Sequence, residues 1–188
     1  MVLILCGLFK ISPLVADSSI ERVAYHETAH VVVALILETT RVPWLARIGT
    51  FSETTFKIDL RREVNLIHEA AVQFAGVEQE RIMGVNSCNL AISGEKDFKQ
   101  WQKFSRDTLN LSHQEAIQKA DEGSKLARRI LLENADIIEI FATELRRLKE
   151  LKSEDFSRLM IEALAKRLSR ACQRSLIPTK SDLRLSQH

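Results

Sequence analysis

The sequence is poor in the residues that build specialised scaffolds. It has three cysteines, six glycines and three prolines among 188 residues. Because the cysteines are widely separated and odd in number, they indicate neither a disulfide framework nor a zinc-knuckle spacing. We therefore expect a reducing, cytoplasmic compartment. The formal charge of +2 is too small to indicate a nucleic-acid partner.

Long apolar runs and nucleotide-binding motifs are also missing. The apolar stretch Met1–Phe9 is too short to cross a bilayer, which needs about twenty residues. It lacks the positive region that opens a secretory signal, because Lys10 follows it. We expect residues 1–17 to form a separate apolar segment, such as a docking strand, in a protein that is cytoplasmic or peripheral to a membrane. Since no G-x-x-x-x-G-K loop occurs, we expect no nucleotide site in this chain.

The residues that are present are typical of a helix-rich globular protein, with 45% hydrophobic and 28% charged side chains. Ser18 and Glu21 form a capping-box pattern that predicts a helix from about Ile20 to Leu37. Its end, Val31–Leu37, is apolar on every side and β-branched, so local propensity alone also allows a strand. The preceding cap favours a buried helix.

The remaining pattern predicts a mainly α fold with one small β-hairpin. The expected elements are strands at 47–51 and 54–58, a helix at about 61–83 that stops at Gly84, a loop at 86–93, a helix at 94–109, a helical segment at 113–149 interrupted near Asn134, and a last helix after Ser153. A second capping box, Ser112 with Glu115, precedes the long segment. We assign residues 18–152 to the main domain and 153–188 to a C-terminal basic amphipathic helix and tail.

The basic face of that last helix carries Arg158, Lys166, Arg167, Arg170 and Arg174. Ordinary solvation explains such a face. The alternative is that Arg167, Arg170 and Arg174 dock the protein on an anionic surface.

Residues 26–30 form the pattern H-E-x-x-H on the first predicted helix. Residues four apart on a helix lie on the same face, with side-chain roots about 5 to 6 Å apart, so the imidazoles of His26 and His30 can reach one ion. Zn²⁺ suits such a pair, because it takes nitrogen ligands and keeps one tetrahedral position for water. The alternative is that both histidines are merely packed or exposed side chains.

Glu27 follows the first histidine and lies about 100° around the helix. It therefore flanks the ion without having to bind it. This is where a general base belongs, because a carboxylate there can take the proton of a zinc-activated water that attacks a carbonyl carbon.

A third protein ligand is required, and spacing alone does not identify it. The extended metzincin pattern is excluded, because Val33 and Ile36 stand where that pattern requires Gly and His. The candidates are Glu69, Glu80, Asp97, His68 and His113.

Four segments in the same order resemble the protease domain of the FtsH family of membrane-bound AAA zinc proteases. Glu21–His30 (ERVAYHETAH) is similar to the lead and zinc motif of that family. Ala75–Glu80 (AGVEQE) resembles its Ala-Gly-Arg-Ala-Ala-Glu helix, and Ser93–Phe98 (SGEKDF) resembles its Thr-Gly-Ala-Ser-Asn-Asp-Leu loop. Ala127–Asp136 (ARRILLENAD) resembles its Ala-x-x-Ile-Leu-x-x-Asn-Arg-Asp stretch.

The resemblance covers about residues 20–160 and implies a mostly helical zinc metalloprotease fold. It implies that Asp97 is the third ligand, and it makes Glu80 a candidate to support the ligands from behind. Thr28 and Ala29 replace the Ala and Gly of the family motif, and the loop before Asp97 is one residue shorter. The family's ATPase module has no counterpart in these residues.

The leading hypothesis is a zinc-dependent endopeptidase that acts on a polypeptide substrate, with Glu27 as general base and His26, His30 and Asp97 as ligands. The alternative is a catalytically silent adaptor or assembly subunit that keeps the fold and binds protein partners. A homo-oligomer or a separate ATPase partner is compatible with either hypothesis.

Overall fold

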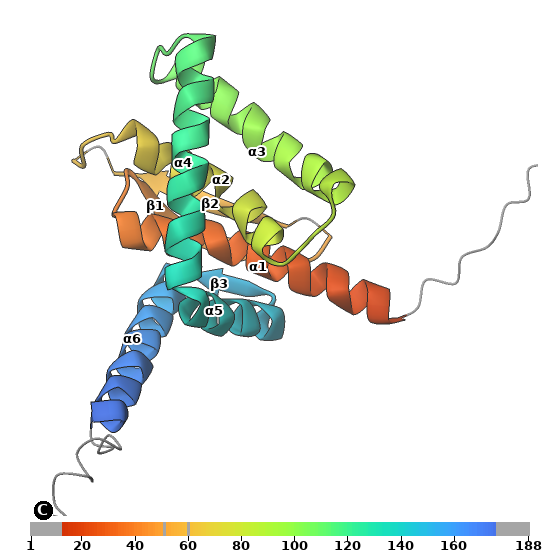
Figure 1. Ribbon diagram of the computed structural model, residues 1–188, viewed down its shortest axis with the longest axis vertical. Coiled ribbons are helices and arrows are strands. Elements are labelled where there is room, and N and C mark those ends of the chain that lie inside the picture. The colour runs from red at the N-terminus through yellow and green to blue at the C-terminus, as the bar shows by residue number, and fades with distance from the viewer. Residues whose placement is uncertain (1–12, 51, 60, 176–188) are drawn as a thin grey trace, which may run out of the picture.

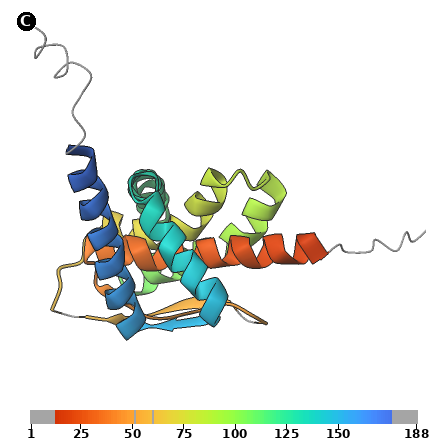
Figure 2. The same ribbon diagram turned by 90° about the horizontal axis from the view of Figure 1, so that it is seen from below.

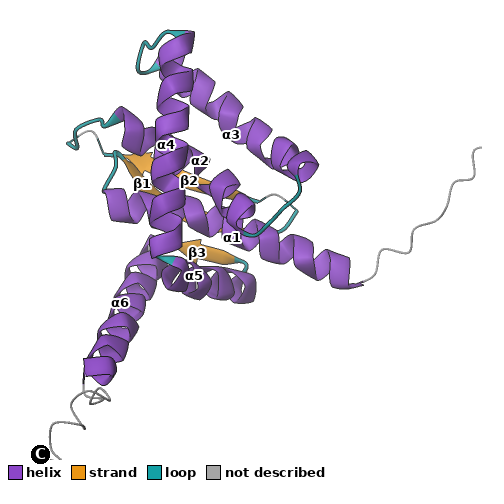
Figure 3. Ribbon diagram, in the orientation of Figure 1, coloured by secondary structure: helices purple, strands orange, loops and turns teal. Residues whose placement is uncertain are grey.

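The computed structural model describes residues 13–50, 52–59 and 61–175. It confirms a mainly helical fold with a small antiparallel sheet (Figures 1 and 3). Residues 1–12 of the predicted apolar segment and the predicted tail after residue 175 lie outside the described residues. Figure 2 shows helix α1 between the sheet on one side and helices α2, α3 and α4 on the other.

Helix α1, Pro13–Leu37, is the central element of the fold. It begins at Pro13 and not near Ile20, so Ser18 lies inside the helix and the predicted capping box is wrong. Proline is favoured at a first helical position, because its missing N–H has no partner there in any case. The ambiguous run Val31–Leu37 is helical. Its apolar side chains on several faces are explained by packing against α2, α5 and β1.

The sheet has three antiparallel strands in the order β2-β1-β3. Strand β1, Arg41–Arg47, precedes the predicted position 47–51, and β2, Glu53–Ile58, lies close to its prediction. The third strand, β3, Glu150–Lys152, was not predicted. Pro43 is tolerated in the middle strand because the register shifts between Pro43 and Leu45, and β3 pairs with β1 only from Leu45 onward.

Helices α2, Leu66–Ile82, and α3, Ser87–Asp107, bring the second wall of the site to α1. Asn65 caps α2 by accepting two backbone N–H groups with its side chain, and Asn86 caps α3 by accepting one. Helix α2 therefore starts later than predicted. Most of the predicted loop 86–93 is the first turns of α3, which begins seven residues before the predicted start at 94.

Helices α4, His113–Glu133, and α5, Ala135–Leu148, follow the prediction closely. The capping box of Ser112 and Glu115 is confirmed, and the helix breaks at Asn134 as expected. Helix α4 packs tightly on α2, because a Cβ at Gly123 would lie 2.5 Å from the Cβ of Ala70.

Helix α6, Ser153–Ser175, leads away from the body of the protein (Figure 2). Arg167 of its basic face is committed to the fold, since its guanidinium donates to Asp136, to Asn134 and to the carbonyl of Glu133. This weakens the anionic-surface alternative, which relied on Arg167. Among the described helices, none combines the length and apolar composition that a membrane span requires.

Candidate metal centre

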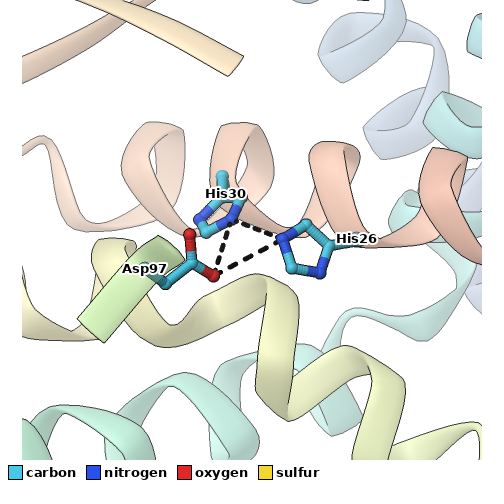
Figure 4. Close-up of side chains that lie close together, drawn as sticks. All are labelled: His26, His30 and Asp97. Carbon is cyan, nitrogen blue, oxygen red and sulfur yellow. Dashed lines mark hydrogen bonds and ion pairs between the residues drawn. The ribbon is translucent and has the colours of Figure 1, made fainter. Parts of the chain in front are cut away.

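The structure brings His26 and His30 of α1 together with Asp97 of α3 (Figure 4). The two Nε2 atoms of the histidines lie 3.2 Å apart. The Asp97 Oδ2 atom lies 3.4 Å from Nε2 of His26 and 3.6 Å from Nε2 of His30. Among the described residues, these three form the one group of His, Cys, Asp and Glu whose ligand atoms converge closely enough to hold a metal ion.

Hydrogen bonds on the far side of each ring fix which nitrogen faces the centre. Nδ1 of His30 donates to the carbonyl oxygen of Val72 at 2.7 Å, and Nδ1 of His26 donates to Oε1 of Glu80 at 3.0 Å. In the neutral rings, both Nε2 atoms are then unprotonated acceptors. Such outer hydrogen bonds are typical of histidines that bind a metal through the other nitrogen.

Asp97 supports the same conclusion, because it is only 5% exposed and its Oδ2 has no hydrogen-bond partner. A buried carboxylate oxygen without a partner is costly, and here it faces two nitrogen lone pairs. Three acceptors that face one another need a cation between them. Ligands at about 2.0 to 2.1 Å from a tetrahedral zinc ion lie about 3.3 to 3.4 Å from one another. The measured separations of 3.2, 3.4 and 3.6 Å therefore fit zinc with two nitrogen ligands and one oxygen ligand.

The electrostatics of the centre also favour positive charge. Burial lowers the pKa of His26, but the neighbouring carboxylates of Asp97 and Glu80 outweigh burial and raise this pKa to about 10. Burial raises the pKa of Asp97, but the charges of His30 and His26 more than offset it, so the pKa lies below its usual range. Without a metal ion, a proton on His26 therefore supplies the positive charge that the centre requires.

Two helix stripes, each of residues four apart, build the centre. The α1 stripe consists of Arg22, His26 and His30, and the α2 stripe of Val72, Gly76 and Glu80. The stripes meet in antiparallel order, because His30 contacts Val72 whereas Arg22 and His26 contact Glu80. Gly76 provides the space for the His26 ring, since a Cβ there would lie 2.5 Å from Cε1 and 2.6 Å from Cδ2 of that ring.

Glu80 of α2 joins the three helices of the centre through its side-chain contacts. Its side chain is 2% exposed. Besides His26, it accepts a hydrogen bond at 2.7 Å from the hydroxyl of Ser93, which lies one turn before Asp97 on α3. The Arg22 Nε atom lies 3.9 Å from Oε1 of Glu80. Burial raises the pKa of Glu80, but the hydrogen bonds from His26 and Ser93 lower it further than burial raises it.

Glu27 lies in the same cleft as the three ligand residues. The cleft has a volume of about 250 Å³. The hydroxyl of Thr54 on β2 donates to Oε2 of Glu27 at 2.7 Å and also contacts the Glu27 carbonyl oxygen at 3.0 Å. Thr54 therefore holds one carboxylate oxygen of Glu27, and the other has no hydrogen-bond partner among the described residues.

The other candidates for a third ligand lie elsewhere. Glu69 is buried and accepts hydrogen bonds from the backbone N–H and the hydroxyl of Thr40. It also pairs with Arg41 at 3.1 Å. His68 lines a separate surface pocket beside α4, and His113 is an exposed first residue of that helix.

Several residues of the centre were not predicted. They are Thr54, Val72, Gly76 and Ser93. Val72 acts through its backbone carbonyl, so its side chain carries no signal. Gly76 carries a signal, because a glycine inside a helix costs about 0.5 to 1 kcal/mol relative to alanine and therefore calls for a packing reason.

No protein-family model matches the chain, and no curated protein matches it either.

Proposed function

We propose that the protein is a zinc-dependent endopeptidase. The observation that carries the proposal is the convergence of Nε2 of His26, Nε2 of His30 and Oδ2 of Asp97 on one point, with the Glu27 carboxylate in the same cleft. The resemblance of residues 20–160 to the FtsH protease domain is a second, independent support.

Each residue then has a definite role. His26, His30 and Asp97 would hold zinc, and the chemistry that zinc supplies when bound is a lowered pKa of coordinated water and a polarised substrate carbonyl. Glu27 would take the water proton on the carboxylate oxygen that Thr54 does not hold, and would deliver it to the leaving amine. Thr54 orients Glu27 for that transfer.

The position of β2 supports a polypeptide substrate. Among the described residues, β2 pairs only with β1, so its other edge presents backbone N–H and C=O groups. Its residues Thr54 and Phe56 also line the cleft. An extended peptide can add to such an edge by main-chain hydrogen bonds, which recognise backbone and not a particular side chain.

The two departures from the family motif do not disturb the ligands. The hydroxyl of Thr28 donates to the carbonyl of Ala24 at 2.8 Å and is completely buried. Ala29 is also fully buried, within the core cluster. The additional atoms of both residues are therefore directed into the core of the protein. Delivery of substrate by a separate ATPase partner, or assembly into a homo-oligomer, stays a prediction.

The test is the replacement Glu27→Gln in the full chain, beside the control Glu21→Gln. Glu21 lies on the same helix, pairs with Arg146 and does not line the cleft. We expect Glu27→Gln to lower casein hydrolysis by about 10²- to 10⁴-fold, while the bound zinc stays at one ion per chain and the control stays active. Full activity of Glu27→Gln would refute its role as base. Wild-type protein that binds no stoichiometric zinc and cuts no peptide would favour the adaptor alternative.

A further inference from the structure

The three acidic side chains of the cleft all belong to the candidate metal centre. Glu27 accepts from Thr54, and Glu80 accepts from His26 and Ser93. Asp97 faces the two histidines. Glu80 and Asp97 lie against basic groups, whereas Glu27 accepts from a neutral hydroxyl and keeps one carboxylate oxygen free for the proposed proton transfer.

Two basic side chains on opposite walls of the cleft have few ion-pair or hydrogen-bond partners. Lys96 of α3 is exposed, lines the cleft and makes no ion pair within the described part of the chain. Arg22 of α1 also lines the cleft with a side chain that is 30% exposed. Its single ion pair is the long 3.9 Å contact with Glu80, and its buried Nε has no hydrogen-bond partner.

The third basic residue of the cleft, Arg41, differs from these two. Its guanidinium is buried, pairs with Glu69 at 3.1 Å, donates to Gln73 at 2.6 Å and lies 4.4 Å from the centre of the Phe104 ring. Its charge is neutralised within the fold. With a divalent ion on the ligand set, the ion together with Lys96 and Arg22 outweighs the three carboxylates of the cleft, so the loaded cleft carries net positive charge.

We propose that Lys96 and Arg22 select peptides that carry an acidic side chain close to the scissile bond. The inference rests on the proposed function, because the scissile bond is the one held at the metal centre. Lys96 directly precedes the ligand Asp97, and Arg22 lies one turn before the ligand His26. Both cations thus reach the substrate residues next to the centre. Ile92, 73% exposed and also lining the cleft, offers an apolar contact to the stem of such a side chain.

The experiment uses short quenched fluorescent peptides of one sequence, in which a single position near the cleavage site is Glu, Gln or Lys. Wild-type protein loaded with zinc should cut the Glu peptide about two- to fivefold faster, in kcat/KM, than the Gln peptide, which is the range for one partly exposed charge pair. The Lys peptide should be cut most slowly. In Lys96→Glu the order should reverse, with the Lys peptide cut fastest.

The matched control is Lys103→Glu, which makes the same change of charge on the same helix at an exposed position outside the cleft. It should keep the wild-type order. Zinc content is measured for both variants, so that a loss of metal is distinguished from a change of preference. Equal rates for the three peptides in wild type, or an unchanged order in Lys96→Glu, would overturn the inference.

Binding to zinc-loaded Glu27→Gln separates this inference from the proposed function. The same peptides, titrated by fluorescence anisotropy, should bind in the order Glu, Gln, Lys. Binding in that order without hydrolysis by wild type would refute the peptidase and retain the charge preference. Hydrolysis without any order would retain the peptidase and refute the preference, and absence of any binding would also refute the preference.

Discussion

Gly76 leaves the space that the His26 ring fills, so Gly76→Ala tests the metal centre from behind. In an ordinary helix interior, this replacement stabilises the protein by about 0.5 to 1 kcal/mol, because alanine loses less backbone entropy. Here the new methyl group would lie 2.5 Å from Cε1 and 2.6 Å from Cδ2 of the His26 ring. Carbon atoms pack at about 3.5 to 4.0 Å, so the ring must move by about 1 Å.

The displacement is large compared with what a metal site tolerates. Ligand distances must match their ideal values within about 0.2 Å. A shift of about 1 Å also breaks the hydrogen bond between His26 and Glu80, and loss of such an outer partner alone costs about 10- to 100-fold in metal affinity. We therefore expect zinc affinity to fall by at least about 100-fold, which corresponds to about 2.7 kcal/mol of binding free energy.

The assay is a competition titration of zinc against a chromophoric chelator, with circular dichroism to follow the fold. The control is Gly94→Ala on α3, where the nearest atom to a new Cβ is a methyl of Val77 at 3.2 Å. The control should bind zinc like wild type. If Gly76→Ala keeps its helical signal and binds zinc with wild-type affinity, the ring position described for His26 is wrong.

Two further predictions concern the ligands and pH. Asp97→Ala should lose stoichiometric zinc on dialysis, and Glu80→Gln should bind zinc about 10- to 100-fold more weakly than wild type. The control Glu95→Ala, at an exposed position on the same helix as Asp97, should bind zinc normally. The zinc content is measured by metal analysis after dialysis, and zinc retained by Asp97→Ala would contradict the assignment of Asp97 as a ligand. In the metal-free protein, the raised pKa of His26, about 10 against 6.5, stabilises the fold fully below about pH 6.5, and this contribution is lost as the pH rises toward 10. Zinc must displace that proton, so we expect zinc affinity to rise about tenfold per pH unit between pH 7 and 9; a flat profile by calorimetry would refute this linkage.

The fold was predictable wherever local pattern and local contacts agree. The Ser112 capping box and the break at Asn134 depend on neighbouring residues, and both were found. Strand β3 could not be found, because its three residues form a strand only by pairing with Leu45–Arg47 about one hundred residues earlier. The start of α3 was missed because Ser87–Asn89 is polar, although Asn86 is a good helix cap.

The candidate site also contains residues that local spacing predicts and residues that it does not predict. The pairing of His26 with His30 follows from helical spacing alone. Asp97 came only from the family resemblance, since no periodicity links α3 to α1. Thr54 is brought to Glu27 by the path of the sheet, which no local pattern near either residue encodes.

The register of α1 against α2 is what makes the centre specific. If α1 slid along α2 by one turn, about 5.4 Å, Glu80 or Val72 would lie opposite His26 in place of Gly76. Neither of these side chains leaves room for the imidazole ring. The one register that seats His26 over Gly76 also brings Nδ1 of His26 to Glu80 and Nδ1 of His30 to the carbonyl of Val72. Because buried helix packing sets this register, the candidate ligands His26 and His30 are held in place by the core and not by loops. A small residue flanked four positions away by an acid, on the helix that follows an H-E-x-x-H helix, is therefore a pattern that could identify such centres from sequence.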